Sequence, residues 1–262
     1  MPLTEQQRQE AADRLLQAER TCTAIDPLTQ LYPGIQVADS YDVQLRVIKA
    51  KTAAGARIVG KKIGLTSTAM QQQLGITSPD YGHLLTTLAV DDNGEFERAR
   101  LIWPRIEPEI AFVLERPLRG PGINIAQVLA ATAYVTPAFE IIDSRIKDWK
   151  IKFEDTVADN GSSAGHVLGT QRRRPDELDL RLTGVVFMQN GEDIGYSSGA
   201  AALGNPAAAV AWLANALADY GIGLDAGEVI LPGALTKSFD ANPGDVFRAE
   251  YDGLGSVSVR VV

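Results

Sequence analysis

The sequence predicts an α+β protein, because its strand patterns and helix patterns are largely segregated along the chain. Helix patterns gather before residue 55 and between residues 205 and 221. A doubly wound parallel sheet would need strands and helices in regular alternation, which this order lacks. The 262 residues, 45% of them hydrophobic, suffice for one large or two small packed domains. The strand patterns fall at about residues 57–65, 103–114, 134–142, 185–197 and 228–262.

Residues 1–55 are expected to form a helical lead-in that packs on a main, strand-rich domain of residues 56–262. Two helices are indicated there by their end signals. The signals are a capping box at Thr4–Gln7, an end near Thr21, a second cap at Asp39 or Ser40, and Gly55 as the stop.

The strand at residues 57–65 contains two adjacent lysines, Lys61 and Lys62. Successive side chains of a strand point to opposite faces, so only one of the two lysines can face a given pocket. Gly60 and Gly64 leave no side chains beside Lys62, so backbone or a ligand can come close to it. The pattern leaves open which face holds the pocket, and two solvated lysines are an equal alternative.

Two short elements are predicted next. Thr66, Ser67 and Thr68 are expected to cap a short helix that runs to about residue 74. Residues 78–82, Ser-Pro-Asp-Tyr-Gly, predict a turn, because proline favours its first corner and aspartate and glycine favour the later ones. An aspartate in such a turn most often only braces it.

Two glutamates on one strand face are the main functional signal. Glu107 and Glu109 project to the same face, with Cα atoms about 6.6 Å apart. Like charges this close repel unless a cation or a proton lies between them. A third acid, Glu140, lies in a second apolar strand, where carboxylates are scarce. These acids suit a hard divalent cation; the alternative is a solvated edge strand, to which Pro108 is suited.

The remaining elements are predicted from caps, turns and polarity. The polar stretch 143–165 reads as a long loop, and therefore as a candidate lid or pocket wall. Asn190-Gly191 is a strong type I′ hairpin signal. Asn caps and a Pro at the first helical position mark two helices. These elements are a helix from Asn124 to about 133, the hairpin 185–189/193–197, a helix from Asn205-Pro206 to Gly221, and strands 228–231, 246–251 and 256–262.

Charge and composition exclude several classes of function. The net charge is −8 and no block of lysines or arginines stands out, which argues against nucleic acid and anionic membranes as partners. We find no signal peptide and no apolar run near 18 residues, and therefore expect a cytoplasmic protein outside the membrane. With two histidines and one cysteine, zinc and copper sites are disfavoured. A metal would need oxygen ligands, as Mg²⁺ or Mn²⁺ does.

Several stretches in order resemble the 2-hydroxypenta-2,4-dienoate (2-oxopent-4-enoate) hydratases of aromatic-ring degradation, within the fumarylacetoacetate hydrolase superfamily. The resemblance runs from about residue 8 to the end of the chain. No single stretch would suffice, but their common order makes the match strong. The most specific stretches are residues 60–67, 79–82, 104–110, 143–151, 155–163, 203–206 and 253–257.

The resemblance implies a mixed β-roll or sandwich with flanking helices, and homo-oligomers. It implies a magnesium or manganese site made by Glu107, Glu109 and Glu140. It also implies that Lys62 and Asp80 face the substrate. Further pocket positions that it implies are Thr66, Ser67, Asn160, Ser162 and Ser163, while Gly161 stands where the pattern has alanine.

The implied reaction is the addition of water to a 2-hydroxyalka-2,4-dienoate of a meta-cleavage pathway, giving a 4-hydroxy-2-oxoacid. The substrate carboxylate and the adjacent oxygen can chelate a hard cation, which polarises the 2-oxo group. Three glutamates and one divalent ion sum to −1, so Lys62 supplies the charge that holds the substrate carboxylate. Asp80 is the expected acid and base that moves protons between the dienol's far end, C4 and water.

Three alternatives remain. The sister enzyme 4-oxalocrotonate decarboxylase shares the metal ligands but releases carbon dioxide; its branch has an apolar residue before Tyr-Gly, so Asp80 favours the hydratase. The carbon–carbon hydrolases of the superfamily need a histidine-activated water, and His83 and His166 match no such position, so they read as structural. A non-catalytic subunit in complex with a pathway decarboxylase or aldolase would not need Lys62, Asp80 and the glutamates.

Overall fold

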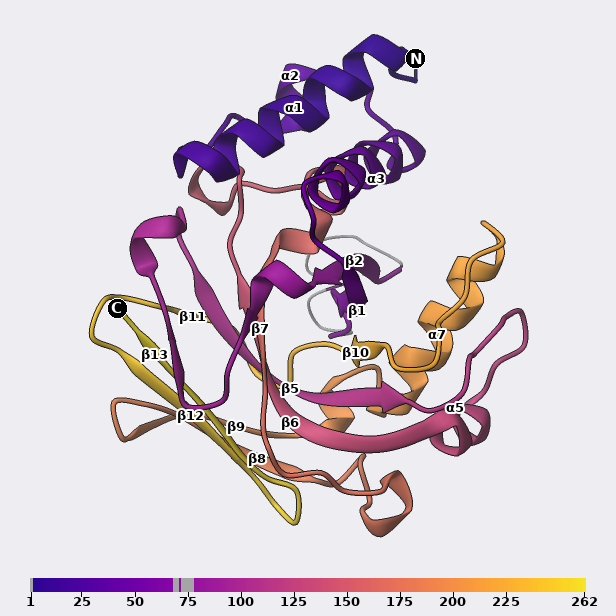
Figure 1. Cartoon of the computed structure of the whole chain (residues 1–262), viewed down its shortest axis with the longest axis vertical. Coiled ribbons are helices and arrows are strands. Elements are labelled where there is room, and N and C mark those ends of the chain that lie inside the picture. Colours follow the sequence, from indigo (N-terminus) through magenta and orange to yellow (C-terminus); the bar gives the residue numbers. More distant parts are fainter. Residues whose placement is uncertain (1, 68–70, 72–77) are drawn as a thin grey trace.

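Two β-sheets form the body of the molecule, and helices lie at one end and along its sides (Figure 1). The computed structural model describes residues 2–67, 71 and 78–262. The N-terminal helices lie together at the top of the view in Figure 1. The α-helices among these described residues are α1 (Glu5–Thr21), α2 (Leu28–Leu31), α3 (Val37–Ala53), α5 (Ile125–Ala131), α6 (Phe153–Ala158) and α7 (Pro206–Ala218).

Both sheets mix parallel and antiparallel pairs, which confirms the predicted α+β class and the mixed β-roll type. The larger sheet has the order β2 (Asp80–Leu85), β1 (Ile58–Gly64), β10 (Val229–Leu231), β5 (Arg105–Leu114), β6 (Thr132–Ile142), β7 (Ser163–Leu168) and β3 (Ala89–Val90), with β11 (Phe239–Asp240) paired to β5. The smaller sheet has the order β4 (Gly94–Phe96), β13 (Gly255–Val261), β12 (Val246–Tyr251), β8 (Gly184–Gln189) and β9 (Glu192–Ser198).

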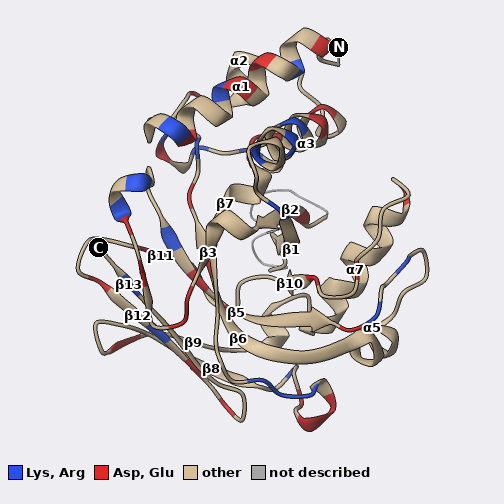
Figure 2. Cartoon of the chain, viewed as in Figure 1, with Lys and Arg blue, Asp and Glu red and all other residues tan. Residues whose placement is uncertain are grey.

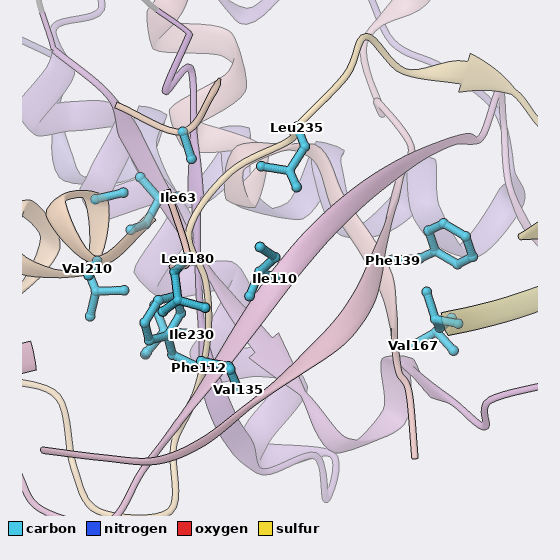
Figure 3. Packing of buried hydrophobic residues seen from close by; sticks show 14 of the residues in the cluster. Ile63, Ile110, Phe112, Val135, Phe139, Val167, Leu180, Val210, Ile230 and Leu235 are labelled. Carbon is cyan, nitrogen blue, oxygen red and sulfur yellow. The ribbon is translucent and has the colours of Figure 1, made fainter. Parts of the chain in front are cut away.

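Strand β5 alternates between an apolar face and an acidic face, as predicted. Ile110 and Phe112 face the main hydrophobic core, where Figure 3 shows them among side chains from β6, α7 and β10. Glu107 and Glu109 lie on the opposite face. The alternative of an exposed edge strand is wrong, because β6 pairs along one side of β5 while β10 and β11 pair with its two ends on the other. Pro108 lies in the gap between these two short partners, where its missing N–H leaves no strand bond unmade.

The N-terminal helices pack on the strand-rich part through a core of their own. Leu15, Leu28 and Val43 from these helices meet Ile146 and Ala158. Helix α3 begins at Val37, two residues before the expected cap, because Gln36 occupies the cap and its N–H donates to Asp39. The division of the chain at residue 55 stays a prediction.

Two local predictions between residues 66 and 82 fare differently. The predicted turn at 78–82 is wrong: Asp80 begins strand β2, whose six residues are all buried against β1 and the helices. Tertiary pairing therefore overrides the local turn chemistry of Asp and Gly. The short helix expected to run to residue 74 falls mostly on residues 68–70 and 72–77, which lie outside the described residues.

The predicted long loop at 143–165 is also wrong for most of its length. It contains α6 and a short 3₁₀ turn at Asn160–Ser162, and β7 begins at Ser163. Some of its polar residues are buried because they pair with one another: the Arg145 guanidinium donates to the Asp159 carboxylate, and both side chains are almost fully buried. Lys147, Asp148, Lys150 and Lys152 are exposed. A polar composition alone could not reveal this internal pairing.

Helix α7 is apolar along most of its length. The segment Gly199–Ala218 is long and apolar enough to cross a membrane by length and composition, which the sequence analysis did not expect, and half of it is buried inside the fold. In the view of Figure 2, lysines and arginines are interspersed with acids, in line with the absence of a basic block from the sequence. Exclusion from membranes stays a prediction.

The cap of α7 gives a stability prediction. The Asn205 side chain accepts a hydrogen bond from the Ala207 N–H at 2.9 Å, as the sequence predicts. Asn205→Ala should lower the free energy of unfolding by about 1 kcal/mol, because one N–H at the helix start loses its acceptor. Asn205→Gly should lower the free energy of unfolding by only a few tenths of a kcal/mol. Urea unfolding measures both, and equal losses in the two variants would contradict the capping role.

Candidate functional site

The three predicted acids meet where β5 and β6 lie side by side. Glu107 and Glu140 are directly opposite each other in the antiparallel pair. One carboxylate oxygen from each of Glu107, Glu109 and Glu140 lies within 4.8 Å of the others. Glu109 and Glu140 are fully buried and Glu107 is half-buried. The structure therefore brings the predicted metal ligands together in the interior.

Bringing three carboxylates together in the interior is electrostatically unfavourable. Burial, followed by the charge of Glu140, raises the pKa of Glu107 to about 7. The same two causes raise the pKa of Glu109 well above its usual value, and burial raises the pKa of Glu140 despite the pull of Lys62. A cation between these groups would remove the repulsion that raises their pKa values.

The oxygens of the cluster also show the bonding pattern of a cation site. Glu109 Oε2 accepts a hydrogen bond from the Gly233 N–H at 2.7 Å. Glu109 Oε1 and Glu140 Oε1 are buried, and neither has a hydrogen-bond partner among the residues that the structure describes. Buried polar atoms normally have partners, so these oxygens point to an additional ligand. Carboxylate oxygens at this spacing fit a hard divalent cation such as Mg²⁺.

Lys62 faces the acids, which answers the question that its strand pattern left open. Its Nζ lies 3.1 Å from Glu140 Oε2 and donates to the carbonyl of Gly161 at 2.9 Å. Burial would lower the pKa of Lys62, but the surrounding carboxylates, Glu140 first, raise it above its usual value. Lys61 lies on the other face of β1, where it pairs with Glu228 at 2.6 Å. The alternative of two solvated lysines is wrong.

Asp80 stands next to Lys62, across the β1–β2 pair. It is opposite Gly64 in register, and a Cβ atom on Gly64 would lie 2.1 Å from Asp80 Oδ1 and 3.3 Å from Lys62 Nζ. The bare glycine therefore makes room for both charged groups. Burial raises the pKa of Asp80 despite Lys62 and the Thr156 hydroxyl, which donates to Oδ2 at 3.4 Å. A buried carboxyl with a raised pKa is suited to proton transfer.

The five pocket residues that the resemblance implies less specifically are all at least partly buried. Ser162 and Ser163 are buried; the Ser163 side chain lies beside Glu140, where its hydroxyl lowers the pKa of that carboxyl, and the Ser162 hydroxyl lacks a hydrogen-bond partner within the described part of the chain. Thr66 is buried at the end of β1, and its Oγ1 lies against Gly233. Ser67 follows it and is half-buried. The Asn160 side-chain amide forms two hydrogen bonds with the backbone of His83. Substrate contact by these residues stays a prediction.

Two residues support the site through their backbone, a role that no sequence pattern indicates. Gly161 supplies the carbonyl for Lys62, and Gly233 supplies the N–H for Glu109. Asn160, Gly161 and Ser162 are three successive residues with left-handed backbone, at φ 55°, 60° and 58°. Such strained residues persist only where the surroundings hold them, and they cluster at functional sites. Glycine at 161 and 233 was the only signal available in the sequence.

His166 lies beside the acidic cluster. It is directly opposite Glu140 in the β6–β7 pair, so both side chains share one face, while Val167 faces the core beside Phe139 (Figure 3). Burial lowers the pKa of His166 to about 4, so the ring is neutral at neutral pH. The structural interpretation of the two histidines stays a prediction.

A cavity of about 670 Å³ lies elsewhere, between α1, the β3–β4 segment and the opposite face of β6. Leu16, Phe96 and Ile141 contribute apolar wall, and Glu19 and Lys51 contribute charge. No predicted site residue lines this cavity. The chemistry of the acidic cluster, and not the size of this hollow, marks the candidate active site.

Comparison with known proteins agrees with the family resemblance of the sequence motifs. The family model described as fumarylacetoacetate (FAA) hydrolase C-terminal matches residues 82–262. The chain is 44% identical over 249 residues to 2-hydroxyhexa-2,4-dienoate hydratase of Comamonas testosteroni, with 94% of each chain covered. It is also 44% identical over 260 residues to 4-oxalocrotonate decarboxylase of Pseudomonas sp. (strain CF600), with 99% of this chain and 98% of that one covered.

A solved structure matches over the whole fold. It is 4-oxalocrotonate decarboxylase from Pseudomonas putida G7, complexed with magnesium and adipate, with a TM-score of 0.97 and 42% identity. The match covers 99% of each chain. The family model and these full-length similarities show that this chain belongs to the fumarylacetoacetate hydrolase family.

Proposed function

We propose that this protein is a metal-dependent hydratase that adds water to a 2-hydroxyalka-2,4-dienoate of a meta-cleavage pathway for aromatic compounds. Overall identity does not separate the hydratase from the decarboxylase, because relatives of both names are 44% identical to the chain. The observation that carries the proposal is Asp80, a buried carboxyl beside Lys62 and the acidic cluster. Water addition needs a group that transfers protons, whereas decarboxylation needs only an electron sink.

The proposed cofactor is Mg²⁺ or Mn²⁺, held by Glu107, Glu109 and Glu140. The support is the buried oxygen-only ligand set with unpartnered atoms, together with the magnesium in the related decarboxylase. A bound cation would supply Lewis acidity that polarises the 2-oxo group of the substrate. Glu109 and Glu140, which are fully buried, and the half-buried Glu107 would hold it away from bulk water.

The protein's own residues would divide the remaining work. Lys62 offsets negative charge and offers its ammonium to the substrate carboxylate. Asp80 gives a proton to the far carbon of the dienol while the 2-hydroxyl proton passes to solvent water, which yields the conjugated 2-oxo-3-enoate. Water oxygen then bonds to C4 and a proton from solvent water enters at C3, giving the 4-hydroxy-2-oxoacid. Asp80, once deprotonated, takes the proton that the attacking water loses.

Lys62 gives a kinetic prediction. Lys62→Met keeps most of the side-chain volume and removes the charge, so the KM for the dienoate should rise at least about tenfold. Hydrogen bonds to charged groups typically contribute roughly 1.5–3 kcal/mol, which sets this scale. Lys61→Met is the matched control, because Lys61 faces away from the cluster. Steady-state kinetics with equal KM for wild type and Lys62→Met would mean that Lys62 does not bind substrate.

The proposal itself is tested with the purified protein alone. A panel of 2-hydroxydienoates, with unsubstituted, methylated and carboxylated tails, is assayed for loss of the dienol chromophore and for carbon dioxide release. We expect magnesium-dependent water addition to at least one member. Protein that is inactive on every member without a partner subunit would support the scaffold alternative.

We also propose a cytoplasmic homo-oligomer that acts on a small molecule without nucleic acid or membrane, and that can form a complex with a pathway decarboxylase or aldolase. The acidic net charge of −8 supports the first exclusion. Light scattering of the purified protein, alone and mixed with a pathway decarboxylase or aldolase, measures the assembly. A monomeric mass at assay concentration would contradict the oligomer.

A further inference from the structure

Strand β2, which begins with Asp80, is an edge strand of the larger sheet, paired along one side with β1. On its other side, backbone groups are bonded by side-chain amides in place of a neighbouring strand. Asn160 Oδ1 accepts from the His83 N–H at 2.7 Å, and Asn160 Nδ2 donates to the His83 carbonyl at 3.0 Å. Gln44 Nε2 donates to the Tyr81 carbonyl at 3.0 Å. These amides fix the free edge of the strand that carries Asp80.

Gln44 makes a second contact that reaches the other neighbour of Asp80. Its Nε2 also donates to the Val157 carbonyl of α6 at 2.7 Å. Val157 follows Thr156, whose hydroxyl donates to Asp80 Oδ2. Gln44 thus hydrogen-bonds to both Tyr81, the residue after Asp80 in β2, and Val157, the residue after Thr156 in α6. Both protons of one fully buried amide are used for this purpose.

We propose that Gln44 is a positioning residue for Asp80. By joining β2 to α6, the Gln44 amide sets the direction of the Asp80 carboxylate relative to Lys62 and the acidic cluster. Gln44 lies on α3, outside the residues 82–262 that the family model matches. The N-terminal helices therefore take part in the active site, beyond packing against it. This inference rests on the proposed role of Asp80 in proton transfer.

The test removes the amide and keeps the volume. Gln44→Met leaves the Tyr81 and Val157 carbonyls without this donor, so β2 and α6 can shift relative to each other. A misplacement of about 1 Å can cost on the order of 100-fold in rate, and we expect kcat to fall about 10- to 100-fold. The affinity for Mg²⁺ and for oxalate, a chelating inhibitor, should stay unchanged, because the glutamates and Lys62 are untouched.

Ser40→Ala is the matched control for Gln44→Met. Ser40 is fully buried on the same helix, and its hydroxyl donates to the Gln36 carbonyl of that helix. It loses a buried hydrogen bond without touching β2 or α6, so kcat should remain that of the wild type. A similar loss of kcat in both variants would assign the effect to α3 as a whole and overturn the proposal.

A double-mutant cycle separates positioning from general destabilisation. If Gln44 acts through Asp80, Gln44→Met should lower kcat in the wild type but not further in Asp80→Asn. Equal fold losses in both backgrounds, or wild-type kcat in Gln44→Met, would overturn the proposal. Should Gln44→Met fail to fold, Gln44→Asn, whose amide is one methylene shorter, serves in the same cycle with the same expected loss. A wild-type protein that hydrates no dienoate would instead refute the proposed function, so the two failures are distinct.

Discussion

Replacing Glu140 by glutamine should weaken Mg²⁺ binding by more than 100-fold. Loss of a residue that merely supports a metal ligand typically costs about 10- to 100-fold in affinity, and loss of a charged ligand should cost more. Glu140 is fully buried, faces Glu107 across the strand pair and lies 3.1 Å from Lys62. Glutamine keeps the shape of the side chain but removes one of the charges that would hold the cation.

The measurement is isothermal titration calorimetry with Mg²⁺ and Mn²⁺. Glu228→Gln is the matched control, because Glu228 pairs with the lysine on the opposite face of β1 and should leave the affinity unchanged. Glu107→Gln and Glu109→Gln should behave like Glu140→Gln. Unchanged affinity in all three variants would place the metal site elsewhere.

Stability of the metal-free protein should not follow metal affinity. Burial and mutual repulsion raise the pKa of Glu107 and Glu109, so the charged cluster is unfavourable without a cation. A neutral glutamine at position 107 or 109 relieves this repulsion. We therefore expect the metal-free variants to unfold at urea concentrations no lower than the wild type. Added Mg²⁺ should stabilise the wild type far more than the variants.

The acidic part of the site could be predicted from the sequence because it obeys a local rule. The two-residue period of a strand places Glu107 and Glu109 on one face, and apolar neighbours place Glu140 in the interior. The period could not say whether Lys61 or Lys62 faces inward, because strands β1 and β5 meet only through β10, which lies far away in the sequence. That choice is made by tertiary structure.

The errors have a common physical cause. At residues 78–82 and 143–165, polar and turn-forming residues predicted exposed loops, but Asp80 and Asn160 among them are buried and bonded to partners distant in the chain. Gln44, Thr156 and the carbonyl of Gly161 act through hydrogen bonds whose partners are 37 to 113 residues away in the chain. No local pattern records such contacts. The resemblance, which runs from about residue 8 to the end of the chain, includes both stretches. It did not reveal which groups hold their site residues in place.

Asp80→Asn should lower the turnover of the dienoate roughly 10²- to 10⁴-fold, the usual contribution of a general acid or base. Asparagine has nearly the same size, and the pairing of β2 with β1 uses backbone, so the fold should be kept. Oxalate should bind to the variant as it does to the wild type, because Lys62 and the three glutamates remain. Circular dichroism and oxalate titration therefore separate a lost proton transfer from a lost structure.

The same variant distinguishes the hydratase from the decarboxylase. If the buried Asp80 carboxyl moves protons between the far carbon of the dienol, C4 and water, its loss should slow hydration by the factor given above. Release of carbon dioxide from 2-oxohex-3-enedioate needs only the chelated 2-oxo group as an electron sink, and should be slow in both proteins. Hydration at the wild-type rate by Asp80→Asn would contradict the acid–base role. A wild-type protein that releases carbon dioxide faster than it hydrates any dienoate would refute the hydratase, and the buried carboxyl beside Lys62 would then need a different explanation.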